Sequence, residues 1–324
     1  MSTYQVGIIG CGGISGSHFR GFAETGRAKV VYAWDIAQEA AQRAAEEWGA
    51  RIAGSAEALI EASDIVVIAT PGFAHREYVE LAAAAGKPIL CEKPLALTLE
   101  HALAMKEAVE QAGVPFMMAF NHRYTPAFVQ LKQVQDDGRI GGTVSAWARW
   151  HAPASSARWR QIQESGHWRS SVELSGGRIT EFCSHAVNWL LWVLGRPQTV
   201  YGRALYVTEG FALDDADYAL ITCENGVGLL EVNRHAGVAP EENYGILGHG
   251  GSVVARDNGV FMTPMDGETT EVAIDTTVPT KHEHLLDCIE TGAEPRTGID
   301  DAIDTLRVGL AFNRSARSDQ VEPV

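Results

Sequence analysis

The stretch VGIIGCGGIS, residues 6–15, decides the fold. Its apolar run ends in Gly10, and Gly12 and Ser15 follow with the spacing of a G-x-G-x-x-G fingerprint in which serine replaces the third glycine. In such a fingerprint the first glycine permits a tight turn, the second lets a phosphate approach the backbone, and a small third residue keeps helix and strand close. We therefore expect a strand, a turn and a helix whose N-terminal end, with Gly13 and Ile14, binds the pyrophosphate of a dinucleotide.

The second apolar run, AKVVYAW at residues 28–34, ends directly before Asp35. A carboxylate roughly 20 residues beyond the fingerprint can accept hydrogen bonds from the adenosine ribose hydroxyls. Because Ile36 and Ala37 supply no guanidinium for a 2′-phosphate, the sequence favours NAD over NADP. Asp35 could also simply cap the following helix, and the two roles are compatible.

Short apolar runs alternate with helical segments from residue 4 to residue 121, which is typical of a doubly wound parallel sheet. After that point the order changes, and alternating segments indicate antiparallel strands. The segments expected there are a helix at 126–136, a strand at 143–151, one long amphipathic helix at 178–194, strands near 199–207, 217–223 and 227–235, and helices at 281–291 and 300–315.

These patterns predict an α/β protein of two domains. Residues 1–121 are expected to form a Rossmann domain, and residues 122–324 an α+β domain with an open, mainly antiparallel sheet. Whether the last helix packs back on the first domain stays open.

The composition argues against several classes of partner. With 26 basic and 41 acidic residues the formal charge is −15, and no block of basic residues occurs, so neither nucleic acid nor an anionic membrane is expected to bind. No apolar stretch approaches the roughly 20 residues of a membrane span, and the five cysteines are scattered, so we expect a cytoplasmic protein. The sequence His282-Glu283-His284 lacks a third ligand, and no metal site is expected.

Several segments resemble the Gfo/Idh/MocA family, which is named after glucose-fructose oxidoreductase and inositol dehydrogenase. The resemblance spans nearly the whole chain and implies NAD as cofactor and a carbohydrate or polyol as substrate. It also implies that Thr70, Pro71, His75, Glu92, Lys93 and Asn121 contribute to cofactor binding. The matching segments are the fingerprint at Gly10, Thr70-Pro71, His75, Glu92-Lys93-Pro94, NHRY from Asn121, and ELSGGRITEFCSH ending at His185.

Lys93 and His185 are the candidate catalytic residues, with Glu181 as their partner. Lys93 follows an expected parallel strand, where open α/β sheets bind ligands, although a surface lysine paired with Glu92 would fit the same position. On a continuous helix Glu181 and His185 would share one face, so that the carboxylate could orient an imidazole base; a surface ion pair is the alternative. In the family the matching residues are usually an aspartate and a histidine that act with the lysine.

The same resemblance points to substrate contacts outside the catalytic set. Arg123 and Tyr124 match a family segment that lines the cleft between domains. The Trp- and Arg-rich stretch 147–169, with Trp168 and Arg169, would suit a carbohydrate, since aromatic rings stack on sugar faces and arginine binds hydroxyls. Domain packing or a subunit interface would explain this stretch equally well.

Two positions depart from the family pattern. Asn188 stands where the family often has an aspartate, and an amide can bind substrate but cannot relay a proton. Gly72 stands where an asparagine is common, which removes one cofactor contact.

The sequence thus predicts an NAD-dependent oxidoreductase that transfers hydride between nicotinamide and a ring hydroxyl of a sugar, anhydrosugar, sugar derivative or inositol. Two alternatives remain: a glycosidase that oxidises its substrate only transiently on NAD, and a non-catalytic NAD-binding regulator. An unclaimed face of the second sheet suggests a homo-oligomer, either dimer or tetramer.

Overall fold

The computed structural model describes residues 3–151, 165–208, 213–234, 241–256 and 259–324. The chain divides into two compact units. The first comprises Met1–Phe120 and Pro279–Ile303, and the second comprises Asn121–Val278 and Asp304–Val324. The sequence predicted a single boundary, between residues 121 and 122. It did not predict that residues 279–303 belong to the first unit.

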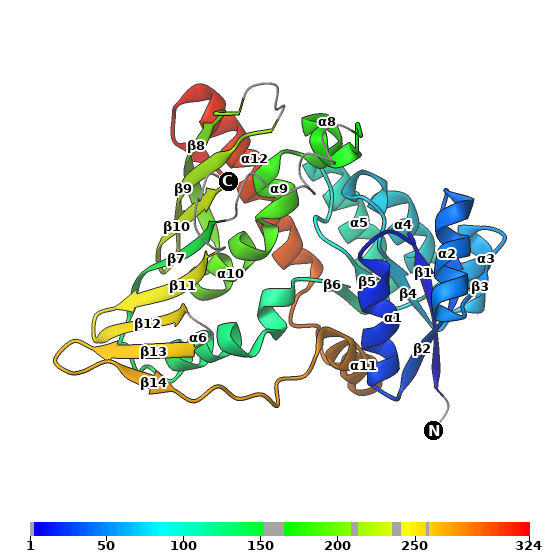
Figure 1. The fold of residues 1–324 in the computed structure, drawn as a ribbon, viewed down its shortest axis with the longest axis horizontal. Helices are drawn as coiled ribbons and strands as arrows, with labels where there is room; N and C mark the ends of the chain where they lie inside the picture. The colour runs from blue at the N-terminus through cyan, green and yellow to red at the C-terminus, as the bar shows by residue number, and fades with distance from the viewer. Residues whose placement is uncertain (1–2, 152–164, 209–212, 235–240, 257–258) are drawn as a thin grey trace. The chain divides into compact units, whose positions relative to one another are not determined.

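The first unit is built on a six-stranded parallel sheet in the order β3-β2-β1-β4-β5-β6 (Figure 1). This order is that of a doubly wound Rossmann domain, so the predicted fold class is confirmed. The central strands are buried on both faces, because helices cover them, and accordingly read as continuous apolar runs such as IVVI. The strands are β1 (Tyr4–Ile9), β2 (Ala28–Trp34), β3 (Arg51–Ile52), β4 (Ile65–Ile68), β5 (Ile89–Cys91) and β6 (Phe116–Met118).

Helices connect these strands and have clear end signals. Thr98 caps one helix by accepting a hydrogen bond from the N–H of His101, and Gly113 ends it in the left-handed conformation with φ 64°. Thr280 and Glu283 form a capping box at the start of another. The helices are α1 (Ser15–Glu24), α2 (Gln38–Trp48), α3 (Ala56–Ala62), the short η1 (Gly72–Ala74), α4 (His75–Ala84), α5 (Leu99–Ala112) and α11 (Lys281–Thr291).

The second unit contains a nine-stranded sheet in the order β14-β13-β12-β11-β7-β10-β9-β8-β15. Its ladders are antiparallel except for the parallel pair β10–β7, which confirms the expected mainly antiparallel sheet. The strands are β7 (Thr143–His151), β8 (Pro197–Leu205), β9 (Ala216–Cys223), β10 (Gly226–Asn233), β11 (Glu241–Gly248), β12 (Gly251–Arg256), β13 (Gly259–Pro264), β14 (Thr270–Val272) and β15 (Glu322–Pro323).

One face of this sheet is covered by helices and the other carries exposed apolar side chains. Trp189 and Leu190 are fully buried against β7 and β10, whereas Leu220 and Leu229 on the opposite face are 44% and 45% exposed. The helical segments of this unit are η2 (Asn121–Tyr124), α6 (Pro126–Asp136), η3 (Trp168–Ser170), α8 (Val172–Ser175), α9 (Arg178–Phe182), α10 (Ser184–Leu194) and most of α12 (Ile299–Ser318).

The expected single helix at 178–194 is wrong. The structure has two helices, α9 and α10, which are interrupted at Cys183, where φ is −102° and ψ is 2°. Arg178, at the start of α9, is buried and reaches strand β9, with its Nε 3.6 Å from an oxygen of Asp217. This long-range contact orients α9 independently of α10, and a local periodicity cannot register it.

No helix among the described residues is long and apolar enough to cross a membrane.

Candidate active site

The glycine loop between β1 and α1 has the geometry of a phosphate-binding turn. Gly10 has φ 96°, and a Cβ there would lie 2.6 Å from the backbone carbon of Ala69, so only glycine fits between β1 and β4. A Cβ on Gly12 or Gly13 would meet nothing within 4 Å. Ser15 donates a hydrogen bond to the carbonyl of Gly12 at 2.7 Å. The loop therefore leaves open backbone at the N-terminal end of α1, where an anionic group can approach.

Asp35 fixes this loop from the end of β2. Its carboxylate accepts hydrogen bonds from the N–H of Cys11 at 2.7 Å and from the N–H of Ala37 at 2.8 Å. Each carboxylate oxygen retains a second lone pair, so these bonds do not compete with a ribose hydroxyl. The neighbouring Ile36 is exposed and supplies no positive charge.

The ends of β4 and β5 are linked by His75. Its ring is completely buried, with Nε2 2.8 Å from the carbonyl oxygen of Thr70 and Nδ1 3.1 Å from that of Leu95. The imidazole thus ties the Thr70-Pro71 turn to the segment after Lys93, and the expected contribution of His75 to cofactor binding stays a prediction. Thr70 Oγ1, by contrast, is buried without a hydrogen-bond partner among the described residues.

Gly72 has a packing explanation. A Cβ there would lie 3.0 Å from Cγ of Pro94 and 3.1 Å from its carbonyl oxygen. The asparagine common in related sequences would therefore displace Pro94 in this chain.

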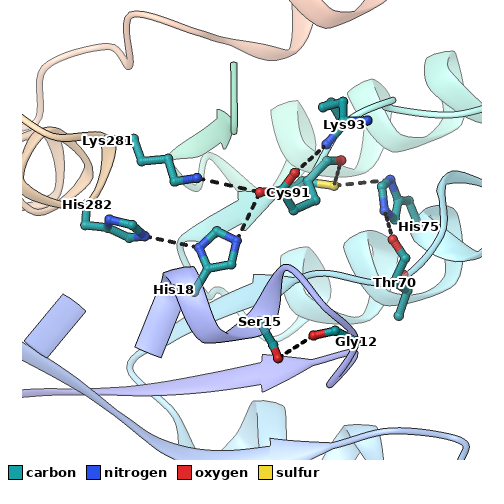
Figure 2. Close-up of polar contacts among 10 residues, drawn as sticks. Gly12, Ser15, His18, Thr70, His75, Cys91, Lys93, Lys281 and His282 are labelled. Carbon is teal, nitrogen blue, oxygen red and sulfur yellow. Dashed lines mark hydrogen bonds and ion pairs between the residues drawn. The ribbon is translucent and has the colours of Figure 1, made fainter. Parts of the chain in front are cut away.

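Lys93 follows β5 and is half-buried, and the Lys93–Pro94 peptide bond is cis. The carboxylate of Glu92 is buried and contacts His18 and Lys281, which Figure 2 labels, while its Oε2 accepts a hydrogen bond from the N–H of Lys93 at 3.3 Å. The contacts of Glu92 in this structure are internal, and its expected contribution to cofactor binding stays a prediction.

In the second unit Glu181 is bound by Arg169. The Nε of Arg169 donates to Oε1 of Glu181 at 2.8 Å, and the Glu181 side chain is almost completely buried. Arg169 also stacks on Trp168, with its guanidinium carbon 4.4 Å from the ring centroid. Because the helix breaks at Cys183, the expectation that Glu181 and His185 share one helical face no longer holds.

His185 lies in an aromatic pocket of about 200 Å³ within the second unit. The ring of His122 lies 5.3 Å from that of His185, centroid to centroid. Burial lowers the pKa of His122 to about 4, although a hydrogen bond to the backbone of His185 opposes this shift. A neutral His122 places no positive charge of its own beside His185. The remaining lining residues are Trp150, Phe182, Cys183, Ala186, Val232 and Tyr244.

Arg123 and Asn188 bind each other. The Nε of Arg123 donates to Oδ1 of Asn188 at 2.9 Å, and Nδ2 of Asn188 donates to Oγ1 of Thr305 at 3.1 Å. Both polar atoms of the Asn188 amide are thus used inside the second unit, and Asn188 is 1% exposed. This corrects the expected substrate contact of Asn188, which instead links η2 to α12.

The other predicted positions have the following surroundings. Ile14 precedes α1 and is exposed, Pro71 precedes η1, and Asn121, whose carbonyl accepts a hydrogen bond from Thr125, begins the second unit. Tyr124 is buried. Residues 152–164 of the Trp- and Arg-rich stretch, including Trp159 and Arg160, lie outside the described residues.

The five cysteines are buried, and the two histidines of the His282-Glu283-His284 segment have separate partners. Burial raises the pKa of the Cys11 and Cys223 thiols to about 12. His282 contacts His18, whereas Nε2 of His284 accepts a hydrogen bond from the N–H of Arg296, so the two rings diverge.

Sequence reasoning missed His18, His122, Lys281 and His282. His18 and Phe22 recur with helical spacing on α1, and this pattern predicts only a packed face. His282 belongs to the segment His282-Glu283-His284, which the sequence analysis considered only for metal binding, and Lys281 directly precedes it. Their association depends on a contact across 264 residues, which no local signal predicts.

The residues present fit NAD. Gly12 and Gly13 offer open backbone at a helix N-terminus, the Asp35 carboxylate stands at the end of β2 with acceptor capacity left, and Thr70 Oγ1 is an unpaired polar atom among the described residues at the end of β4. These positions lie at the carboxyl ends of β1, β2 and β4, next to the point where the strand order reverses.

Comparisons with known proteins agree with this geometry. A family described as "Oxidoreductase family, NAD-binding Rossmann fold" matches residues 4–120, and the "GFO/IDH/MocA C-terminal domain" matches residues 128–254. D-apiose dehydrogenase of Paraburkholderia graminis is 27% identical over 98% of this chain and 88% of its own length. Inositol 2-dehydrogenase of Rhizobium meliloti is 26% identical over 97% of each chain.

A solved structure is similar over the same extent. The WlbA dehydrogenase from Bordetella pertussis, in complex with NADH and UDP-GlcNAcA, superimposes with a TM-score of 0.84 at 25% identity, over all of this chain and 99% of that one. Family matches to both units, and relatives aligned along nearly the full length, confirm the resemblance seen in the sequence. The chain belongs to the Gfo/Idh/MocA family of oxidoreductases, and its first unit is the family's NAD-binding Rossmann domain.

Proposed function

We propose that this protein is a dehydrogenase that oxidises a ring hydroxyl of a sugar, sugar derivative, anhydrosugar or inositol with NAD. The observation that carries the proposal is the combination of an open glycine loop with Asp35 in the first unit and a histidine in an aromatic pocket in the second. The full-length relatives named above act on apiose and inositol, which are polyhydroxylated. Aromatic walls suit the apolar faces of such rings.

His185 is the proposed proton acceptor. Oxidation of a secondary alcohol breaks the O–H and C–H bonds and forms a C=O bond, so the hydroxyl proton needs a base. The imidazole of His185 is the proposed base for that proton, and the neutral His122 beside it does not oppose the charge that results. Bound NAD supplies the acceptor for the hydride that leaves carbon.

Lys93 is the proposed polarising residue. Its ammonium would donate a hydrogen bond to the substrate oxygen and favour the negative charge that develops there. Glu181 is proposed to act through Arg169, which its carboxylate binds beside Trp168. Arg123 and Asn188 hold the η2 segment that carries His122.

Spectrophotometry with purified protein, NAD and a panel of sugars, anhydrosugars and inositols tests this proposal. Substrate-dependent formation of NADH with one or a few compounds is the expected result. If NAD binds and no compound yields NADH, the dehydrogenase is refuted. Release of free sugar from a glycoside without net NADH would instead identify the glycosidase.

We also propose that the protein self-associates through the open face of the second sheet. A groove of about 660 Å³ lies on this face, and its lining includes Trp147, Tyr218, Leu220 and Leu229. Light scattering coupled to size-exclusion chromatography measures the mass; a dimer or tetramer is expected, and a monomer of 35.0 kDa would refute the proposal.

A further inference from the structure

Four ionisable side chains meet in the interior of the first unit behind Lys93. His18 comes from α1, Glu92 from the segment after β5, and Lys281 and His282 from the start of α11. Each is at most 8% exposed, and His18 is completely buried. We call these four residues the Glu92 cluster. Buried charges persist in proteins only when they are paired, so the cluster has to be satisfied internally.

Its contacts form a chain that ends on Glu92. His282 Nε2 lies 3.1 Å from His18 Nδ1, and His18 Nε2 lies 3.1 Å from Glu92 Oε1. Lys281 Nζ lies 3.6 Å from the same carboxylate oxygen. Figure 2 shows His18 beside His282, and dashed lines mark the contacts given above.

The protonation states follow from these contacts. Burial opposes ionisation of Glu92, but the His18 hydrogen bond and the Lys281 charge outweigh it and hold the pKa of the carboxyl well below its usual value. Burial, with the neighbouring Lys281 charge, lowers the pKa of His282 to about 2, and burial also lowers the pKa of His18. An ionised carboxylate only accepts, so a neutral His18 donates from Nε2 and accepts from His282 at Nδ1. His282 therefore donates to His18, and His18 donates to the Glu92 carboxylate.

Helix α1 leaves room for the His282 ring at Gly21. Gly21 lies within the helix, where glycine is less favourable than alanine. A Cβ at Gly21 would lie 2.1 Å from two atoms of the His282 ring. The His282 ring also packs on Phe22, with centroids 4.7 Å apart. The small residue therefore gives His282 its place against α1.

Glu92 connects the cluster to the backbone of Lys93. The N–H of Glu92 donates to the carbonyl of Ile68 at 2.8 Å, which fixes its backbone to the sheet. The second carboxylate oxygen accepts the N–H of Lys93 at 3.3 Å. The carboxylate is therefore held on one side by α1 and α11 and bonded on the other to the backbone of Lys93.

We propose that His18 is a positioning residue for Lys93: with His282 and Lys281 it holds the Glu92 carboxylate, and Glu92 holds the Lys93 backbone in the orientation that the reaction uses. The assignment of Lys93 to the reaction rests on the proposed function. Because His18 lies on the helix that follows the glycine loop, it also couples the cofactor-binding helix to the proposed polarising residue.

Two variants of His18 separate this role from mere packing. In His18→Phe the ring is kept and the donor to Glu92 is lost, whereas His18→Gln keeps an N–H donor. Leu59→Ala is the matched control, since Leu59 is a fully buried residue of the same unit on α3 and has no part in the Glu92 cluster. The readouts are amide hydrogen exchange of Lys93 at single-residue resolution, kcat, and the Kd for NAD.

For His18→Phe we expect exchange at Lys93 to be faster by about tenfold or more, and kcat to be lower by about tenfold, with the Kd for NAD changed by less than about threefold. In His18→Gln both values should return to within about threefold of wild type, and Leu59→Ala should leave both near wild type. Unchanged exchange at Lys93 in His18→Phe would overturn the inference, as would faster exchange with unchanged kcat. If wild type oxidises no compound of the panel, the proposed function fails, but the exchange measurement still decides whether His18 holds Lys93.

Discussion

Two alanine substitutions in the glycine loop should have different effects. Gly10→Ala should destabilise the fold, whereas Gly12→Ala should weaken NAD binding. Gly10→Ala places a Cβ 2.6 Å from Ala69 at a φ of 96°, whereas the Cβ of Gly12→Ala meets no protein atom within 4 Å. The left-handed backbone costs about 1–2 kcal/mol and the overpacking about 1–3 kcal/mol, so Gly10→Ala should lose about 2–5 kcal/mol of folding free energy. Gly12→Ala should be neutral, or stabilising by up to about 1 kcal/mol, because alanine restricts the unfolded chain.

Although Gly12→Ala should not destabilise the fold, it should weaken NAD binding. A methyl group there occupies the space through which a pyrophosphate approaches the backbone, so the Kd for NAD should rise by at least about tenfold, or 1.4 kcal/mol. Gly298→Ala is the control: its Cβ would have only an ordinary 4.0 Å contact with the carbonyl of Pro295. Titration calorimetry measures the Kd, and circular dichroism measures the Tm.

The reasoning would be refuted if Gly12→Ala bound NAD as tightly as wild type while Gly298→Ala behaved as the control should. It would also be refuted if Gly10→Ala had an unchanged Tm, because the close approach of β1 to β4 would then cost nothing.

Four further predictions concern the second unit. His185→Ala should lower kcat by about 100-fold or more and leave the Kd for NAD unchanged, since only a proton acceptor is lost. Asn188→Ala should lower the free energy of unfolding by about 1.5–3 kcal/mol, because buried Arg123 loses its acceptor. Leu229→Glu, on the open sheet face, should shift the assembly toward monomer in light scattering. Asp217→Asn should remove part of the fall in Tm that wild type shows as the pH rises from about 4 to 8.

The sign of the Asp217 effect follows from its surroundings. Burial, with the nearby Asp214 carboxylate, raises the pKa of Asp217 from 3.8 to about 8. Between these values the folded protein keeps a proton that the unfolded chain releases, so stability falls with rising pH by up to about 1.4 kcal/mol per unit. A parallel fall in Tm for wild type and Asp217→Asn would contradict this account. Full turnover by His185→Ala, an unchanged Tm of Asn188→Ala, or an unchanged mass of Leu229→Glu would contradict the other three predictions.

Much of the fold could be predicted because local signals agree with it. Strand β7, helix α6 and helix α11 have the predicted bounds, since apolar periodicity, Pro126 at a helix start and the Thr280 capping box all mark their ends. The division of 178–194 at Cys183 was not predictable, because each half is compatible with helix and the break accompanies the buried contact between Arg178 and β9.

The candidate site shows the same limit. Gly10, Gly12 and Asp35 were recognisable because the chemistry of phosphate and ribose binding constrains residues that are near in sequence. The partners of Glu92, Glu181 and Asn188 were not recognisable, since each is set by tertiary contacts: His18 with Lys281, Arg169, and Arg123 with Thr305. All three side chains are buried, and burial is set by the packing of segments that are distant in sequence.

The proposed activity is the oxidation of a polyhydroxylated ring compound with NAD. The most direct test is the absorbance of reduced nicotinamide when purified wild type and His185→Ala are offered NAD with sugars, anhydrosugars and inositols. We expect substrate-dependent NADH formation by wild type that is lost in His185→Ala while NAD binding is retained. NADH formation of equal rate in both proteins, or none in a wild type that binds NAD, would contradict it.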